Sequence, residues 1–243
     1  MLKPSMRLPL LPSQAPAYVN ERKFAGPVHA RTRVAALLDA RCLPDREHPA
    51  GRINSVYFDT PGLHAKAEKD NGDNLKAKVR LRWYGRREEL GGEVRLFVEL
   101  KRRVGSARSK ERLDTVVPAD WIADTPLDDP SFPAFLARQA ERLGEPLGPA
   151  WSPVCRIVYD RLRYDDPLGG SRVALDWNIR ADRFNESRFP WAVPVALDEM
   201  VCEFKNPGGI PPAWAEEMVR AGLRLRSFSK YGECMARLCE SRL

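Results

Sequence analysis

Polar and apolar side chains alternate along residues 75–84. One side of this segment carries only cations, namely Lys76, Lys78, Arg80 and Arg82. The opposite side carries Ala77, Val79, Leu81 and Trp83. A period of two is typical of a β-strand whose two faces meet different surroundings. Because neighbouring cations on one face lie roughly 7 Å apart and repel one another, the segment is either a solvated basic edge strand or part of a site for an anion.

The same plan recurs in four further segments, at residues 93–103, 155–163, 172–180 and 201–205. Each has an apolar face and a second face that is rich in Arg and Lys and poor in carboxylates. A closed antiparallel barrel satisfies all five segments if the polar faces line its lumen. The outward apolar faces must then be covered by helices. The pattern therefore predicts an α+β fold, built on a closed antiparallel β-barrel whose basic tunnel suits a polyanion.

The remaining segments predict the other elements. Strands are expected at 18–24, 52–58 and 195–205. Helices are expected at 27–42, 63–69, 118–147 and 211–221, and a final helix is capped by Ser229. Turns or loops are expected at 71–73, 86–92 and 101–110, the last of them as a mobile basic loop. We expect one domain over residues 17–243, preceded by a disordered tail at residues 1–16.

Composition narrows the classes of function. The chain has 40 Lys and Arg against 33 Asp and Glu, a net charge of +7, which suits a phosphate-rich ligand or a nucleic acid. We expect no nucleic-acid partner, because the aromatic residues do not interleave with the cations as base-stacking platforms require. Five cysteines without zinc spacing predict reduced thiols in a cytoplasmic protein. The three scattered histidines argue against a His-based metal site. No apolar run approaches the roughly 20 residues of a membrane span.

Carboxylates on the basic faces are the candidate metal ligands. Cations bind phosphate chains through charge-assisted hydrogen bonds. Such contacts bind a product as firmly as they bind the transition state, so they do not by themselves give catalysis. Catalysis also needs a divalent metal on the phosphate oxygens, and oxygen ligands suit Mn²⁺ or Mg²⁺. The candidates are Glu21, Glu99, Asp176 and Glu203. Each of them could instead neutralise neighbouring cations in a structural network.

Seven short motifs follow one another along the chain. They are residues 21–24 (ERKF), 57–61 (YFDTP), 78–82 (KVRLR), 98–101 (VELK), 159–161 (YDR), 203–205 (EFK) and 229–231 (SKY). Together, and in this order, they resemble the VTC (vacuolar transporter chaperone) domain. That domain is the polyphosphate polymerase branch of the triphosphate tunnel metalloenzymes, whose relatives include the adenylate cyclase and thiamine triphosphatase group. The resemblance extends from about residue 18 to the C-terminus.

This resemblance implies an eight-stranded tunnel that binds a nucleoside triphosphate and polyphosphate. The residues expected to act on the phosphates are Arg80, Arg82, Lys101, Arg161 and Lys230. The residues expected to bind the substrate are Lys23, Lys78, Tyr159, Arg172 and Lys205. Glu203 is expected to ligate Mn²⁺ or Mg²⁺.

The implied activity is transfer of the γ-phosphoryl group of ATP to a growing polyphosphate chain. Val19 stands where tunnel hydrolases have the first Glu of an ExExK pattern, which argues against a two-metal triphosphatase. Two alternatives stay open: hydrolysis of an inorganic or nucleoside triphosphate, and non-catalytic binding of polyphosphate. Members of this family can carry membrane modules. We expect none in this chain, and a membrane-protein partner stays open.

Overall fold

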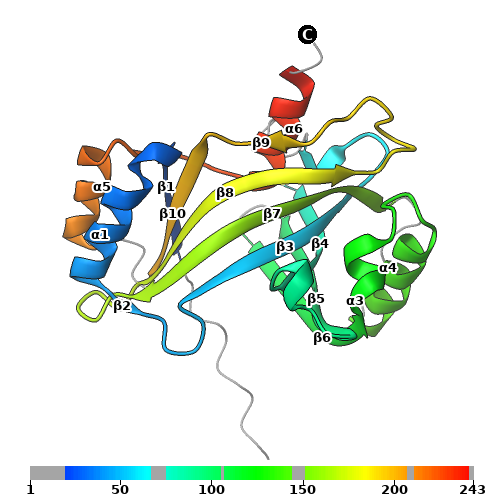
Figure 1. Ribbon diagram of the computed structural model, residues 1–243, viewed down its shortest axis with the longest axis horizontal. Helices are drawn as coiled ribbons and strands as arrows, with labels where there is room; N and C mark the ends of the chain where they lie inside the picture. The colour runs from blue at the N-terminus through cyan, green and yellow to red at the C-terminus, as the bar shows by residue number, and fades with distance from the viewer. Residues whose placement is uncertain (1–19, 67–74, 105–106, 144–150, 207–210, 241–243) are drawn as a thin grey trace, which may run out of the picture.

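Eleven strands join in one antiparallel sheet within the residues that the computed structural model describes, which are 20–66, 75–104, 107–143, 151–206 and 211–240 (Figure 1). The strands are β1 (Asn20–Pro27), β2 (Leu43–Pro44), β3 (Ala50–Asp59), β4 (Leu75–Tyr84), β5 (Glu93–Val104), β6 (Ala107–Pro118), β7 (Ser152–Asp165), β8 (Arg172–Phe184), β9 (Val195–Ala196), β10 (Glu199–Asn206) and β11 (Arg224–Leu225). The sheet order is β11-β1-β10-β8-β7-β3-β4-β5-β6, with β2 paired to β7 and β9 paired to β8.

Helices flank this sheet and connect its strands. The α-helices are α1 (Arg31–Arg41), α3 (Ala119–Asp124), α4 (Ser131–Arg142), α5 (Glu216–Arg220) and α6 (Lys230–Glu240). Short 3₁₀ turns are η1 (Val28–Ala30), η2 (Arg87–Glu89) and η3 (Ala213–Ala215). In the described ranges, no helix combines the length and apolar character needed to cross a membrane.

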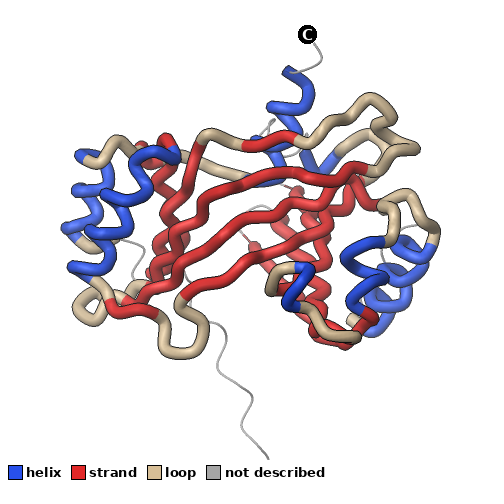
Figure 2. Tube along the Cα trace, viewed as in Figure 1, coloured by secondary structure: helices blue, strands red, loops and turns tan. Residues whose placement is uncertain are grey.

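The sheet is open, so the predicted closed, eight-stranded barrel is wrong. Strand β6 lies at one end of the strand order and β11 lies at the other, and among the described residues no ladder joins the two ends. The sheet instead curves strongly, with β4, β5 and β6 turned away from the line of β8, β7 and β3 (Figures 1 and 2). Alternation predicts that a strand has two different faces, but it does not say whether the edge strands pair with each other. A curved open sheet satisfies the same pattern.

Two groups of helices cover the apolar face of this sheet, as the pattern predicts. Helices α1 and α5 pack on β1, β8 and β10, where Leu38 belongs to the same buried cluster as Phe204. Helices α3 and α4 pack on β3, β4 and β5, where Ile122 and Phe132 belong to the same buried cluster as Leu81. The two groups lie at opposite ends of the sheet (Figure 1). Each group of helices covers the apolar face of strands whose opposite face is basic.

Helix α6 lies on the basic side of the sheet. Its Tyr231 and Met235 share a buried cluster with Ile53 and Tyr57 of β3, and Tyr57 is paired in register with Arg80. Because directly paired residues project to the same face, α6 covers part of the face that carries the cations. The predicted wholly polar lumen is therefore wrong at this end, which is apolar and filled by a helix.

A hairpin occupies the segment predicted as a mobile loop at 101–110. Strands β5 and β6 pair from Glu93 and Pro118 as far as Val104 and Ala107. A run of Lys and Arg usually indicates a solvated loop, and here the cations instead project from two paired strands. The predicted tail at 1–16, the turn at 71–73 and the side chain of Lys76 lie outside the described residues.

The packing of α4 on the sheet generates a stability prediction. Phe132 is fully buried and its ring stacks on Trp121, with centroids 5.0 Å apart. Phe132→Ala should lower the free energy of unfolding by about 3–5 kcal/mol, because it leaves a cavity in a packed core. Urea unfolding followed by circular dichroism measures the loss. Leu168→Ala, at a side chain that is 95% exposed, is the control and should change stability by less than about 0.5 kcal/mol. Equal effects of the two substitutions would contradict this account of the packing.

Candidate functional site

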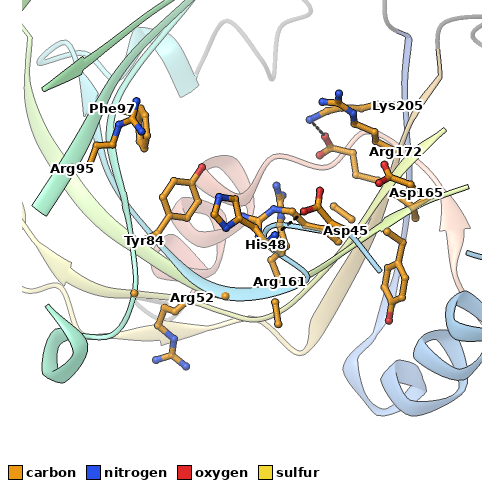
Figure 3. A pocket seen from close by; sticks show the side chains of 18 of the residues that line it. Asp45, His48, Arg52, Tyr84, Arg95, Phe97, Arg161, Asp165, Arg172 and Lys205 are labelled. Carbon is orange, nitrogen blue, oxygen red and sulfur yellow. Dashed lines mark hydrogen bonds and ion pairs between the residues drawn. The ribbon is translucent and has the colours of Figure 1, made fainter. Parts of the chain in front are cut away.

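Two adjoining cavities lie on the basic side of the sheet. The smaller has a volume of about 140 Å³ and the larger about 1050 Å³. Arg161, Glu203 and Lys205 line both of them, so the two cavities meet at these side chains. Figure 3 shows the larger cavity, with Lys205 and Arg172 on one side and Tyr84 and Phe97 on the other.

The structure brings ten of the eleven predicted site residues together around the smaller cavity. They are Lys23, Lys78, Arg80, Arg82, Lys101, Tyr159, Arg161, Glu203, Lys205 and Lys230. The eleventh, Arg172, lines the larger cavity instead. Arg172 is the first residue of β8 and is paired with Lys205. It therefore lies outside the cluster that the other ten residues form. The ten come from β1, β4, β5, β7, β10 and the first residue of α6, because the curved sheet brings these strands around one space.

Glu99 neutralises the arginines of β4. Its Oε2 lies 2.5 Å from Arg80 Nη2 and 3.7 Å from Arg82 Nη1, and its Oε1 lies 4.0 Å from Lys110 Nζ. Arg80 also donates a hydrogen bond to the hydroxyl of Tyr57 at 3.1 Å. Burial alone would raise the pKa of Glu99, but Arg80 and Arg82 outweigh it and lower the pKa to about 2. This carboxylate is therefore a counter-ion of the two arginines.

Asp176 is the counter-ion of Arg161 and Lys230. Its side chain is fully buried, with Oδ1 2.5 Å from Arg161 Nε and Oδ2 2.6 Å from Lys230 Nζ. Burial opposes its ionisation, and the two cations outweigh burial and lower its pKa. Lys230 Nζ also lies 4.5 Å from the centre of the Tyr159 ring, and Arg82 donates to the Tyr159 hydroxyl at 3.5 Å. The guanidinium of Arg161 lies 5.5 Å from the same ring centre, so Tyr159 lies among three cations.

Glu203 is buried between two lysines. Its Oε1 lies 2.8 Å from Lys205 Nζ and its Oε2 lies 4.0 Å from Lys23 Nζ. Burial raises the pKa of Glu203, but Lys205 and Lys23 outweigh it and hold the pKa well below its usual range. Lys23 also contacts Glu21 at 2.6 Å and donates to the carbonyl of Phe228 at 3.2 Å.

Cations outnumber carboxylates in the smaller cavity. Eight Lys and Arg side chains line it against three carboxylates, Glu21, Glu99 and Glu203. Register adds a transverse row of three lysines, in which Lys101 is paired with Lys78 on one side and with Lys110 on the other. Partial removal from water and the charge of Arg80 lower the pKa of Lys101 to about 8. Even with Asp176, which pairs with two of the eight cations, the cations outnumber the carboxylates, and an anionic ligand would lower this excess of positive charge.

Two residues of this region escaped sequence reasoning. Lys110 was placed in a loop, and only the hairpin register shows that it lies opposite Lys101. Asp59 was included in the motif at residues 57–61 without a role of its own, yet it is fully buried and accepts a hydrogen bond from the Tyr231 hydroxyl at 2.8 Å. Its other bonds come from the backbone N–H groups of residues 60, 65 and 66. Asp59 thereby fixes the first turn of α6, directly after Lys230.

Ser229 caps α6, as predicted. Its hydroxyl accepts a hydrogen bond from the backbone N–H of Gly232 at 3.3 Å. The cap and the Tyr231–Asp59 bond together hold Lys230 at the start of the helix. This end of a helix also favours anions through its free N–H groups.

The carboxylates fit a divalent metal only in part. Among the described residues, no group of three or more His, Cys, Asp or Glu side chains could hold an ion by itself. Mg²⁺, however, is commonly bound by one or two carboxylates, with phosphate and water completing its shell. Glu203 fits that second arrangement, since it lies on the shared wall of both cavities. Glu99 and Asp176 fit it less well, because Glu99 lines only the smaller cavity and Asp176 lines neither.

The chain belongs to the VTC domain family, whose model matches residues 17–239. The resemblance of the seven motifs is thereby confirmed. No curated protein sequence matches the chain closely enough to indicate a relative.

Two solved structures are similar over most of their length. One is a candidate adenylate cyclase from Bacillus halodurans, with 12% identity, a TM-score of 0.43, and coverage of 84% of each chain. The other is a candidate adenylate cyclase from Vibrio parahaemolyticus, with 12% identity, a TM-score of 0.41, and coverage of 89% of this chain and 98% of that one. Similarity this low supports no conclusion about fold or activity.

The buried Asp176 pairs generate the second prediction. Asp176→Asn leaves Arg161 and Lys230 without their common counter-ion, and should lower the free energy of unfolding by about 3–5 kcal/mol. Because its pKa is lowered in the folded state, the stabilisation is present above about pH 4 and is lost as the pH falls through the folded-state pKa. Urea unfolding at pH 7 and below pH 4 should therefore show a difference between wild type and variant that shrinks on acidification.

Asp114→Asn is the matched control for this measurement. Asp114 also pairs with an arginine, Arg95, at 2.5 Å, but both side chains are more than half exposed. Its replacement should cost less than about 1 kcal/mol. A loss at Asp176 as small as that at Asp114 would show that the buried pairs contribute no net stability.

Proposed function

We propose that this chain is a metal-dependent polyphosphate polymerase, which transfers the γ-phosphoryl group of ATP to a growing polyphosphate chain. The observation that carries the proposal is the convergence of eight Lys and Arg side chains on one cavity with only three carboxylates. A phosphate chain suits this cavity because each unit brings negative charge and acceptor oxygens for charge-assisted hydrogen bonds. Membership of the VTC domain family supports the same class of substrate.

In the proposed reaction, a terminal phosphate oxygen of the acceptor chain attacks the γ-phosphorus of ATP. The bond from that phosphorus to the β,γ-bridging oxygen breaks, ADP leaves, and the chain gains one unit. Phosphoryl transfer of this kind depends mainly on positioning and charge stabilisation. The side chains proposed to supply both at the phosphates are Arg80, Arg82, Lys101, Arg161 and Lys230.

The other predicted residues would hold the substrate around this centre. Lys23, Lys78 and Lys205 add positive charge on the neighbouring strands, and Tyr159 supports the chain through its hydroxyl and ring. Arg172 would act in the larger cavity, where it lies. Glu203 is the residue that would hold Mn²⁺ or Mg²⁺, and when bound the ion would neutralise charge on the phosphate oxygens.

Incubation with ATP and Mn²⁺ tests the proposal directly. Gel analysis detects long polyphosphate chains, and a colorimetric assay detects free phosphate. Long chains support the polymerase. Free phosphate without chains indicates a triphosphatase instead, and binding of tripolyphosphate without either product indicates a non-catalytic binding module.

The metal role of Glu203 generates the third prediction. Glu203→Gln keeps the shape and one acceptor oxygen of the side chain, but it removes the charge that a hard divalent cation prefers. Mn²⁺-dependent turnover should fall by about two orders of magnitude or more. Tripolyphosphate should still bind in calorimetry, since the Lys and Arg contacts remain.

Glu199→Gln is the matched control, because Glu199 lies on the same strand and pairs with Arg226 at 2.7 Å away from both cavities. Its turnover should stay near that of the wild type. If Glu203→Gln keeps near-normal turnover while its melting temperature falls, Glu203 is only a salt-bridge partner of the lysines.

The lowered pKa of Lys101 generates the fourth prediction. Lys101 loses its proton as the pH rises through about 8 in the unliganded protein, and a bound anion favours the protonated form. Binding must then take up a proton, so tripolyphosphate affinity should fall as the pH rises above 8, by at most about tenfold per unit. Calorimetry at pH 7, 8 and 9 measures this dependence.

The variant Lys101→Arg distinguishes the titration of Lys101 from the titration of tripolyphosphate itself. An arginine stays charged throughout this range, so the variant should retain more affinity at pH 9 than the wild type does. Identical pH profiles of the two proteins would show that Lys101 does not contact the phosphates.

A further inference from the structure

Strand β6 is one of the two edges of the sheet. One side of it pairs with β5 over all 12 of its residues, and within the described residues no strand pairs with its other side. An antiparallel edge of this kind presents a row of backbone N–H and C=O groups to a further strand. The strand at the opposite edge, β11, has only two residues. The β6 edge is therefore the longer surface on which another strand could pair.

Proteins usually prevent pairing at an edge by prolines, by β-bulges or by a short edge strand. In β6 the only proline is Pro118, its last residue, and its register with β5 runs without a shift from end to end. Its length is about twice that of a usual strand. Charged side chains can also repel a second strand. Because β6 carries several of them, their order decides which strand it can accept.

The order of charges in β6 is complementary to itself when the strand is reversed. Two copies of one strand pair antiparallel about a twofold axis, and each such register has one residue at its centre. With Leu113 at the centre, Arg112 of each copy lies opposite Asp114 of the other. Opposite charges at directly paired positions stabilise a sheet, whereas like charges destabilise it.

The neighbouring registers do not have this complementarity. A register centred on Glu111, Arg112 or Asp114 places that charge opposite its own copy, which is unfavourable. The register centred on Leu113 pairs residues 109–117 of each copy and places no like charges opposite one another. It also places Val116, which is 58% exposed, opposite Lys110, whose aliphatic stem can cover an apolar side chain.

Both side chains of the complementary pair are available to a second copy. Asp114 pairs with Arg95 at 2.5 Å, but the Asp114 side chain is still 53% exposed. Arg112 is also exposed, and its guanidinium stacks 3.8 Å from the centre of the Phe97 ring. Stacking uses the face of a guanidinium and leaves the N–H donors at its edge for a carboxylate.

We infer that β6 joins two copies of this chain in a twofold-symmetric dimer, in which the β6 strands pair antiparallel about Leu113. The ladder of backbone hydrogen bonds and two Arg112–Asp114 ion pairs hold the copies together. Both of these residues line the larger cavity, so Arg112 of each copy lies at the wall of the other copy's larger cavity. The inference does not depend on the proposed function, because the dimer needs no ligand.

Disulfide cross-linking of the full chain tests the register. The variant Leu113→Cys is made in a Cys239→Ser background, which removes the exposed thiol of the wild type. In the inferred register the two introduced thiols lie directly opposite each other, within the roughly 7 Å between Cα atoms that a disulfide can span. Oxidation should therefore give a covalent dimer on a non-reducing gel.

Glu111→Cys in the same background is the matched control. Residue 111 projects from the same face of β6 as residue 113, but in this register it lies roughly 14 Å from residue 111 of the second copy. It should remain a monomer on the same gel.

Analytical ultracentrifugation of the reduced, full-length wild type tests the dimer itself. The mass should be twice the 27.5 kDa of one chain. Asp114→Arg changes two attractive pairs into two repulsive ones and should weaken the dimer about tenfold. Arg95→Gln removes the partner of Asp114 within the chain and should leave the dissociation constant of the dimer unchanged.

Three outcomes would overturn the inference. The first is a wild-type chain that stays monomeric at every concentration. The second is cross-linking at residue 111 that equals or exceeds cross-linking at residue 113, which means that the strands do not pair about Leu113. The third is a dimer that Asp114→Arg does not weaken, which places the interface elsewhere on the molecule. None of these results affects the proposed function, which polyphosphate synthesis tests separately.

Discussion

Repulsion among cations on one face of a curved sheet is the constraint on which this site depends. Three buried carboxylates, Glu99, Asp176 and Glu203, each contact cations from two different strands or from a strand and α6. Removal of charges from water costs several kcal/mol per ion unless they are paired, so these contacts permit the strands to approach. The pairing is nevertheless incomplete, because the cations around the smaller cavity outnumber its carboxylates. The remaining positive charge favours an anionic ligand in this cavity.

The packing of helix α6 on the sheet determines where Lys230 lies. Tyr231 stacks on Tyr57, with ring planes 8° from parallel, and its hydroxyl is held by the buried Asp59. Tyr57 in turn accepts a hydrogen bond from Arg80. Lys230 is thus fixed at the boundary between the apolar cluster under α6 and the cation cluster beside it. Packing of the helix and the ion pair with Asp176, 2.6 Å from Lys230 Nζ, together hold this lysine among the other cations.

Sequence reasoning was most successful where the information is local. Alternation placed Arg80 and Arg82 on one face and Leu81 on the other, because the side-chain period of a strand is fixed by its backbone. Neighbouring strands and their register depend on tertiary contacts, so neither the open edges of the sheet nor the position of Arg172 in the larger cavity followed from the pattern. Lys110 was missed for a related reason, since a run of cations resembles a solvated loop until its partner strand is known.

The two ends of the basic surface differ, and this difference limits which ligands match it. At one end, paired strands place Lys78, Lys101 and Lys110 in a row, and an anionic ligand there would lower the repulsion among them. At the other end, Tyr84 lies among partly paired charges, and Arg163 lies 5.7 Å from its ring. A uniform polyanion would be attracted more strongly at the first end than at the second. The larger cavity is lined by seven Lys and Arg side chains against five carboxylates, whereas the smaller cavity is lined by eight against three.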